Sequence, residues 1–207
     1  MKKIKNLTAT ELARYASNVF LYVGRNSICA TLIYRCLELE PNHPVGLRAL
    51  SDFFDQEGTE ALSAIVLEYL IEAQLSLTPE AEQENKQLLF QAKWWWGFAK
   101  HKSGNTNLSA EELMKHEDFE VSEEQYQTFI GGLIEGLGSK KAVVENSVKL
   151  LGIYGGIING DVISENDTLL DILKRNDLNL NGEYETYLNE STEELETFMK
   201  KCEENHT

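Results

Sequence analysis

The feature that most constrains the fold is the helical spacing of apolar residues along almost the whole chain. Apolar side chains recur three and four residues apart, and no segment shows the alternation of a half-buried strand. Proline, the strongest helix breaker, occurs only three times in 207 residues. The pattern predicts an all-α protein with helices at about 9–23, 27–40, 44–57, 59–77, 80–102, 109–116, 122–137, 140–158, 167–175 and 183–203.

Acidic residues are concentrated in the second half of the chain. Residues 1–103 contain 11 basic and 12 acidic residues, whereas residues 104–207 contain 8 and 22, and the net charge of the chain is −15. Such an acidic protein is not expected to bind nucleic acid, because phosphate recognition depends on cationic side chains. The asymmetry, together with the stop signal at Ser103-Gly104-Asn105, predicts two regions, 1–104 and 105–207.

The three cysteines are too few for a secreted disulfide framework. Cys29 and Cys36 lie seven residues apart, on one face of a helix, which predicts small core residues. The basic start of the chain is not followed by an apolar run, so we expect no signal peptide. No run of about 18 apolar residues predicts a membrane span. We therefore expect a soluble, cytoplasmic protein that does not bind membranes.

The first half of the chain repeats itself. Ser17, Phe20 and Gly24 recur 34 residues later as Ser51, Phe54 and Gly58. The segment 35–41 corresponds to 73–79, which lies 38 residues later and also ends in proline. A helix, a glycine turn, a second helix and a proline, at a period near 34, are typical of stacked helical hairpins.

This pattern resembles the tetratricopeptide repeat family over about residues 9–104. The small or aromatic positions of the family are matched in the first copy by Ser17, Phe20, Gly24, Cys29, Cys36 and Pro41. The family's first-helix Trp is replaced by Ala13 and Leu47. A third first helix is expected from Gln91 to Gly104, and the repeat does not extend further.

The resemblance implies a definite architecture. Tetratricopeptide-like hairpins within 9–77 would form an α-solenoid with a right-handed superhelical sense. An acidic helical C-terminal region, 105–207, would pack on the repeats or cap them, because one hairpin cannot bury both of its faces.

The resemblance also implies a concave groove lined by the first helix of each hairpin, and this surface includes Leu21 and Asp55. The residues expected to bind a partner there are Arg14, Asn18, Tyr22, Arg48, Asp52, Trp94, Phe98 and His101. Some members of the family grip the terminal carboxylate of a peptide with basic and Asn side chains. Ala49 occupies an Asn position of that arrangement, so we do not expect carboxylate capture.

Three consecutive tryptophans, Trp94, Trp95 and Trp96, form an unusual local feature. Consecutive helical residues point about 100° apart, so three indoles cover more of the helix than one core-facing stripe. At least one indole should lie outside the local core. The helix is either buried on two sides, by the preceding hairpin and by the C-terminal region, or it presents a partner-binding anchor.

Two glycine series follow in the second half of the chain. Gly132 and Gly136 are four residues apart, and so are Gly152, Gly156 and Gly160. Small residues on one helix face at every turn predict close packing between helices. The segments are too short and polar for the membrane-spanning version of this motif.

No motif predicts catalysis, a cofactor or a metal. Residues 177–188 resemble the start of a calcium-binding loop, but Leu188 occupies the position of the bidentate acid. Residues 131–141 lack the Lys-Ser/Thr pair of a phosphate-binding loop. The four histidines show no zinc-ligand spacing. We expect no catalytic residue, no metal ligand and no cofactor.

These observations favour a non-catalytic helical-repeat protein that binds a protein or peptide. The resemblance implies an adaptor or chaperone, and the acidic second half favours a basic partner steered by charge. A narrower version is the neutralisation or escort of one dedicated basic protein. The alternative is a small all-α enzyme or ligand-binding domain with its pocket in the C-terminal half, which a deep pocket with converging carboxylates and His116 would favour.

Overall fold

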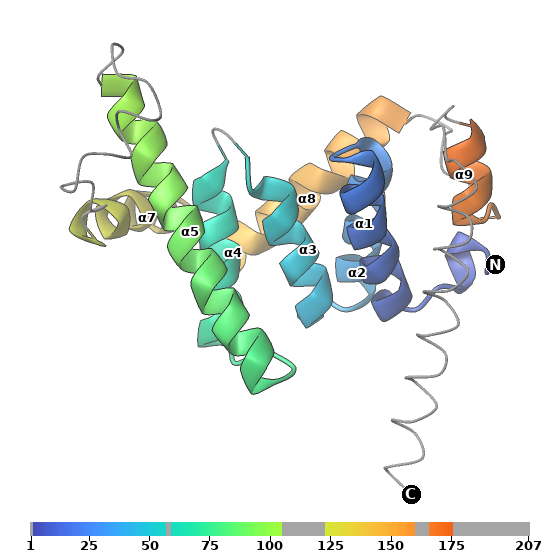
Figure 1. The fold of residues 1–207 in the computed structure, drawn as a ribbon, viewed down its shortest axis with the longest axis horizontal. Coiled ribbons are helices and arrows are strands. Elements are labelled where there is room, and N and C mark those ends of the chain that lie inside the picture. Colours follow the sequence, from blue (N-terminus) through green and yellow to red (C-terminus); the bar gives the residue numbers. More distant parts are fainter. Residues whose placement is uncertain (1, 57–58, 105–122, 160–165, 176–207) are drawn as a thin grey trace, which may run out of the picture. The chain divides into compact units, whose positions relative to one another are not determined.

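The computed structural model describes residues 2–56, 59–104, 123–159 and 166–175 (Figure 1). Within these ranges the chain forms a short 3-10 helix, η1 (Ile4–Asn6), and α-helices, with no strand beyond one isolated bridge. The α-helices are α1 (Ala9–Val23), α2 (Ser27–Leu39), α3 (Pro44–Phe54), α4 (Glu60–Glu72), α5 (Pro79–Gly104), α7 (Glu123–Leu137), α8 (Lys140–Asn159) and α9 (Leu169–Arg175). The all-α prediction is therefore confirmed for the described residues. The helices predicted at 109–116 and 183–203 lie outside them.

The chain divides into two compact units. One comprises Thr8–Ile158, and the other combines Met1–Leu7 with Asn159–Thr207. In the second unit, the Ile4 N–H donates to the carbonyl of Asp167 at 2.9 Å, and Leu169, Ile172 and Leu173 of α9 are buried. The division predicted at residue 104 borders the undescribed residues 105–122 and stays a prediction.

Local chemistry explains where α1 and α2 begin and end. The Thr8 hydroxyl accepts from the Glu11 N–H, and the Glu11 carboxylate accepts from the Thr8 N–H, which together form a capping box. Gly24 ends α1 with a φ of 82°, a conformation that glycine adopts without strain. The Asn26 side chain then caps α2 by accepting from the Cys29 N–H at 2.9 Å. The two helices consequently pack against each other as neighbours.

One predicted boundary is wrong. The helix expected to run to residue 77 ends at Glu72, because Gln74 adopts a positive φ of 54°. The Leu75 N–H donates to the Leu70 carbonyl and the Gln74 N–H to the Ile71 carbonyl, which is the bonding of a Schellman motif. Glycine usually occupies the left-handed position of this motif, so the glutamine gave no stop signal.

Helix α3 packs on α1, α2 and α4, and it approaches α2 closely at Gly46. A Cβ atom on Gly46 would lie 2.6 Å from Cys36 Sγ and 3.0 Å from Leu37 Cδ2. Cys36 and Cys29 are both buried, which confirms their prediction as small core residues. The spacing between α2 and α3 thus depends on the absence of a side chain at residue 46.

We predict that Gly46→Ala destabilises the protein, because the added methyl group forces α2 and α3 apart. Overpacking of this kind costs about 1–3 kcal/mol. Gly132→Ala is the matched control, since a Cβ there meets nothing within 4 Å and alanine favours a helix interior. Urea unfolding measures both changes, and an equal effect of the two substitutions would contradict the close approach.

His43 joins the start of α3 to α1. Its Nδ1 accepts from the Gly46 N–H at 3.1 Å, and its Nε2 lies 2.9 Å from Thr10 Oγ1. Because Nδ1 accepts a hydrogen bond, the ring proton belongs on Nε2, where it can donate to the threonine. Burial lowers the pKa of His43 below 6.5, although Glu40 partly opposes this change.

We predict that His43 makes the free energy of unfolding depend on pH. Its contribution is complete above the unfolded-state pKa of about 6.5, and it is lost as pH falls through that value towards the lower folded-state pKa. His43→Asn retains a capping oxygen but does not titrate, so it should flatten the decline. Urea unfolding at several pH values provides the measurement. Identical pH slopes for both proteins would show that His43 is not responsible.

Helix α4 buries the carboxylate of Glu68 within a largely apolar surface. The Glu68 side chain is 7% exposed and makes two ion pairs, with Lys93 Nζ of α5 at 3.0 Å and Lys140 Nζ of α8 at 2.8 Å. Lys93 also lies 4.4 Å from the ring centre of Tyr126 in α7. Burial lowers the pKa of Lys140, but the nearby carboxylates of Glu68 and Glu72 outweigh burial and raise it overall. Glu68 therefore connects three helices directly and a fourth through Lys93.

We predict that Glu68→Gln lowers the free energy of unfolding by about 3 kcal/mol, because it leaves two partly buried ammonium groups without their carboxylate. Glu72→Gln removes an acid that also binds Lys140 but is exposed, so it should cost less than about 1 kcal/mol. Chemical denaturation of both variants tests the difference. Equal losses would assign Glu68 no special role.

The glycine series have different surroundings. A Cβ on Gly152 of α8 would lie 2.7 Å from the ring of Tyr34, so the predicted close packing is confirmed there. Gly132 and Gly136 of α7 have nothing within 4 Å of such a Cβ, and the prediction is wrong for them. The surroundings of Gly156 and Gly160 lie outside the described residues. No described helix has the length and apolar character needed to cross a membrane.

Candidate functional site

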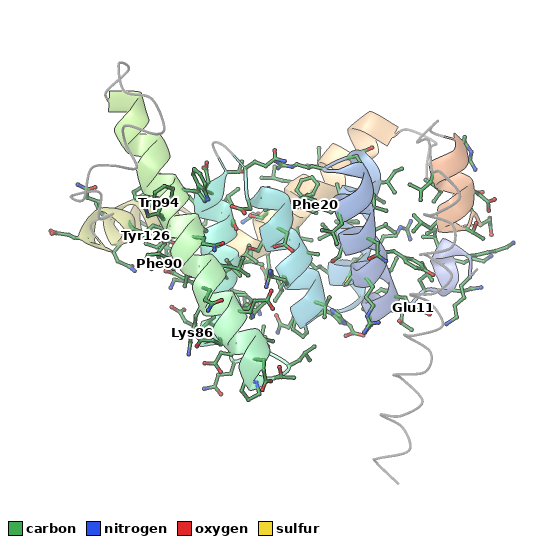
Figure 2. All side chains as sticks on the ribbon, viewed as in Figure 1. Glu11, Phe20, Lys86, Phe90, Trp94 and Tyr126 are labelled. Carbon is green, nitrogen blue, oxygen red and sulfur yellow. The ribbon has the colours of Figure 1, made fainter. Side chains whose placement is uncertain are left out.

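A cavity of about 290 Å³ lies between α1 and α3, and we call it the α1–α3 cleft. Its lining consists of Ala16, Ser17, Phe20 and Leu21 from α1, Cys29 from α2, and Ala49, Asp52 and Asp55 from α3 and its C-terminal cap. Helices α1 and α3 run in the same direction, and Phe20 lies in the gap near their C-terminal ends (Figures 1 and 2). Leu21 is 72% exposed, which places an apolar side chain at the rim.

Small residues line both helical walls of the cleft. Ala16 and Ala49 provide single methyl groups, which cannot fill the space that larger side chains would occupy. The Ser17 hydroxyl donates to the Ala13 carbonyl at 3.1 Å, and the Cys29 thiol donates to the Ala16 carbonyl at 3.4 Å. Both polar groups are bonded to α1 backbone, so this part of the wall is largely apolar.

The Cys29 thiol is unsuited to act as a nucleophile. Its pKa is raised to about 12, mainly by burial and also by the nearby charge of Asp52, and Arg25 lowers it only in part. Since the thiolate is the reactive form, the thiol is inert at neutral pH.

Two carboxylates occupy the α3 wall. Asp52 Oδ1 accepts from Arg48 Nε at 3.1 Å, yet burial raises the pKa of Asp52 despite this partner. Burial also raises the pKa of Asp55, and only the Coulombic attraction of Arg48 acts against it. The cleft therefore combines an apolar wall with two partly desolvated acids.

Arg48 connects α3 with α5. In addition to Asp52, its guanidinium donates to Asn85 Oδ1 at 3.0 Å and to Glu84 Oε1 at 3.3 Å. This predicted partner-binding residue thus has a structural role on the side of α3 that faces α5. Its three hydrogen bonds hold the guanidinium in place beside the cleft.

The structure distributes the other predicted partner-binding residues widely. Asp52 lines the cleft, whereas Arg14 and Asn18 are half-buried on α1 and Trp94 is half-buried on α5, none of them in its lining. The backbones of Tyr22, Phe98 and His101 belong to α1 and α5, but their side chains lie outside the described residues.

The tryptophans point in different directions, as predicted. Trp96 is buried and packs edge-on against Tyr126 of α7, with ring centres 5.6 Å apart, and against Phe129. Trp95 is 43% exposed and makes an edge contact with Trp94. The expectation that at least one indole lies outside the local core is confirmed. Figure 2 shows Trp94 with Phe90 and Lys86 along α5.

Sequence reasoning missed the residues that hollow out the cleft. Ala16 and Ala49 match the small positions of any close helix pair, and nothing in the sequence distinguishes a packed alanine from one facing a cavity. Asp55 and Leu21 were included only as part of a broad groove surface. Their shared position near the C-terminal ends of α1 and α3 is the signal that could have selected them.

The described residues contain no cluster of three or more His, Cys, Asp or Glu side chains able to hold a metal ion. The calcium-like segment 177–188 lies outside them. Comparison of the chain with family models, with curated proteins and with solved structures found no match. The tetratricopeptide resemblance therefore stays a prediction.

Proposed function

We propose that this protein is a non-catalytic binding protein that holds a segment of another protein in the α1–α3 cleft. The observation that carries the proposal is the cleft itself, an open cavity with an apolar wall. Unfilled apolar space next to exposed apolar side chains such as Leu21 is typical of binding sites.

The size and chemistry of the cleft support a protein ligand over a cofactor or substrate. A volume of about 290 Å³ lies at the lower limit of small-molecule pockets, and it suits one or two side chains. The reactive groups of the lining are the Ser17 hydroxyl, the protonated Cys29 thiol, and the carboxylates of Asp52 and Asp55, of which Asp52 is bound to Arg48. None of the lining residues is a histidine, the base that commonly activates a Ser or Cys nucleophile.

The proposal is compatible with a tetratricopeptide-like solenoid. Helix α1 packs on α2, α3 packs on α4, and α3 also contacts α1, as neighbouring hairpins of such a stack would. In that arrangement α1 and α3 are first helices, so the cleft opens on the groove that the resemblance implies. The role would be that of an adaptor, a chaperone or a neutraliser of a basic partner. The acidic second half would accelerate association with such a partner.

We predict that Ser17→Leu abolishes partner binding by filling the cleft. Peptides would be selected on the full chain from a random peptide library and their affinities measured by fluorescence anisotropy. Ser17→Leu should weaken the selected peptides at least about tenfold, whereas Ser17→Ala, which keeps the space open, should bind nearly as the parent.

Circular dichroism melting establishes that both variants fold. Unchanged affinity in folded Ser17→Leu would place the binding site elsewhere. Failure of the full chain to enrich any peptide over the blank surface would contradict the proposed function itself.

A further inference from the structure

We propose that the α1–α3 cleft selects a Lys or Arg side chain on a basic segment of the partner protein, with the cationic head beside Asp55. This inference rests on the proposed function and specifies its ligand. The aliphatic stem of the ligand side chain would lie against Ala16, Phe20 and Leu21. Long cationic side chains commonly bury their stems on apolar surface while the charged head reaches polar groups.

The first argument is a local shortage of positive charge. Three carboxylates, those of Asp52, Glu84 and Asp55, act on the single guanidinium of Arg48. Asp55 and Glu84 in turn raise the pKa of Asp52 through Coulombic repulsion. Arg48 is committed to Asp52, Glu84 and Asn85 by hydrogen bonds, so its attraction for Asp55 is only long-range. A ligand cation would supply the missing charge.

Arg25 does not replace such a cation. Its guanidinium lies 4.3 Å from the ring centre of Phe53, and it contributes to the pKa of Cys29 but not to that of Asp52 or Asp55. Arg25 is therefore held over Phe53, and the carboxylate of Asp55 has only the long-range attraction of Arg48.

The second argument is the direction of the helices. Both α1 and α3 end at the end of the cleft where Asp55 lies, and neither has a basic residue in its last turn. The C-terminal end of a helix carries partial negative charge from its unpaired carbonyls. Two helix ends and two carboxylates consequently favour a cation at the same place.

The third argument is the position of the acids relative to the apolar wall. Asp52 lies in α3 and Asp55 is its C-terminal cap, while Phe20 and Leu21 come from the opposite wall on α1. A ligand side chain that enters between them meets apolar surface on one side and carboxylates on the other. An aliphatic side chain would leave the acids partly desolvated without compensation, and an acidic one would be repelled. The stem of a Lys or Arg side chain would contact the apolar wall, and its charged head would face the carboxylates.

The test uses the peptides selected on the full chain. We expect the enriched sequences to share a Lys or Arg residue. Replacing that residue by norleucine, which keeps the stem and removes the charge, should weaken binding about tenfold at low salt. Asp55→Asn should weaken the parent peptide to a similar extent but have little further effect on the norleucine peptide. Glu124→Gln, which removes an exposed acid of α7, is the matched control and should change neither affinity.

The outcomes distinguish this inference from the proposed function. Suppose that Ser17→Leu abolishes binding but the selected peptides lack basic residues, or that Asp55→Asn weakens the norleucine peptide as much as the parent peptide. In either case the cation assignment is wrong and the cleft is still the site. If Ser17→Leu also leaves binding unchanged, both proposals fail. The norleucine peptide needs no change in the protein, so the test holds even if Asp55→Asn does not fold.

Discussion

The structure of the larger unit depends on the buried carboxylate of Glu68. Helix α4 is apolar on nearly all sides, and an ionised group in such surroundings is tolerated only when its partners are fixed. Lys93 and Lys140 satisfy this requirement from α5 and α8, and Lys93 extends it to Tyr126 of α7. Hydrophobic packing alone lets helices slide past one another, because it has little directionality. An ion pair at hydrogen-bond distance fixes their register, and here one carboxylate does so for two neighbouring helices.

The ion pairs of Glu68 also affect the cleft, because α4 and α5 hold α3 in position. The hydroxyls of Ser51 and Ser63 lie 2.9 Å apart and join α3 to α4, while Arg48 joins α3 to the α5 helix that Glu68 holds. On its other side α3 meets α2 at Gly46, where no side chain fits. Helix α3 is therefore fixed on both sides and cannot move towards α1 to close the space left by Ala16 and Ala49. The cavity persists because its walls are held from outside, not because its lining keeps it open.

The sequence predicts the helices well and the cleft poorly, for different physical reasons. Helix positions follow from local signals, such as the apolar spacing of α1 and Pro79 at the start of α5, and these are independent of the rest of the fold. The end of α4 at Glu72 was missed because Gln74 adopts a positive φ, a conformation that a glutamine in the sequence does not predict. In the sequence, Glu68 cannot be distinguished from a solvated helix glutamate, because its burial results from the packing of α5 and α8. The cleft was missed for the same reason, since a cavity is a property of several helices together and none of its residues carries a distinctive motif.

The placement of acids supports a functional origin of the cleft. The acids in the first turns of α1, α4 and α5 complement the positive ends of those helices, as stability favours. Acids near helix C-terminal ends oppose stability, but two of them have donors: Glu38 accepts from Tyr34, and Glu72 pairs with Lys140. Asp55 follows the last turn of α3, is exposed at the rim of the cleft, and shares Arg48 with two closer acids. Departures from local rules of this kind are expected at functional sites, where a ligand supplies the compensation that the fold does not. A cationic ligand would complete the electrostatic balance at the one end of the cleft where the fold leaves it incomplete.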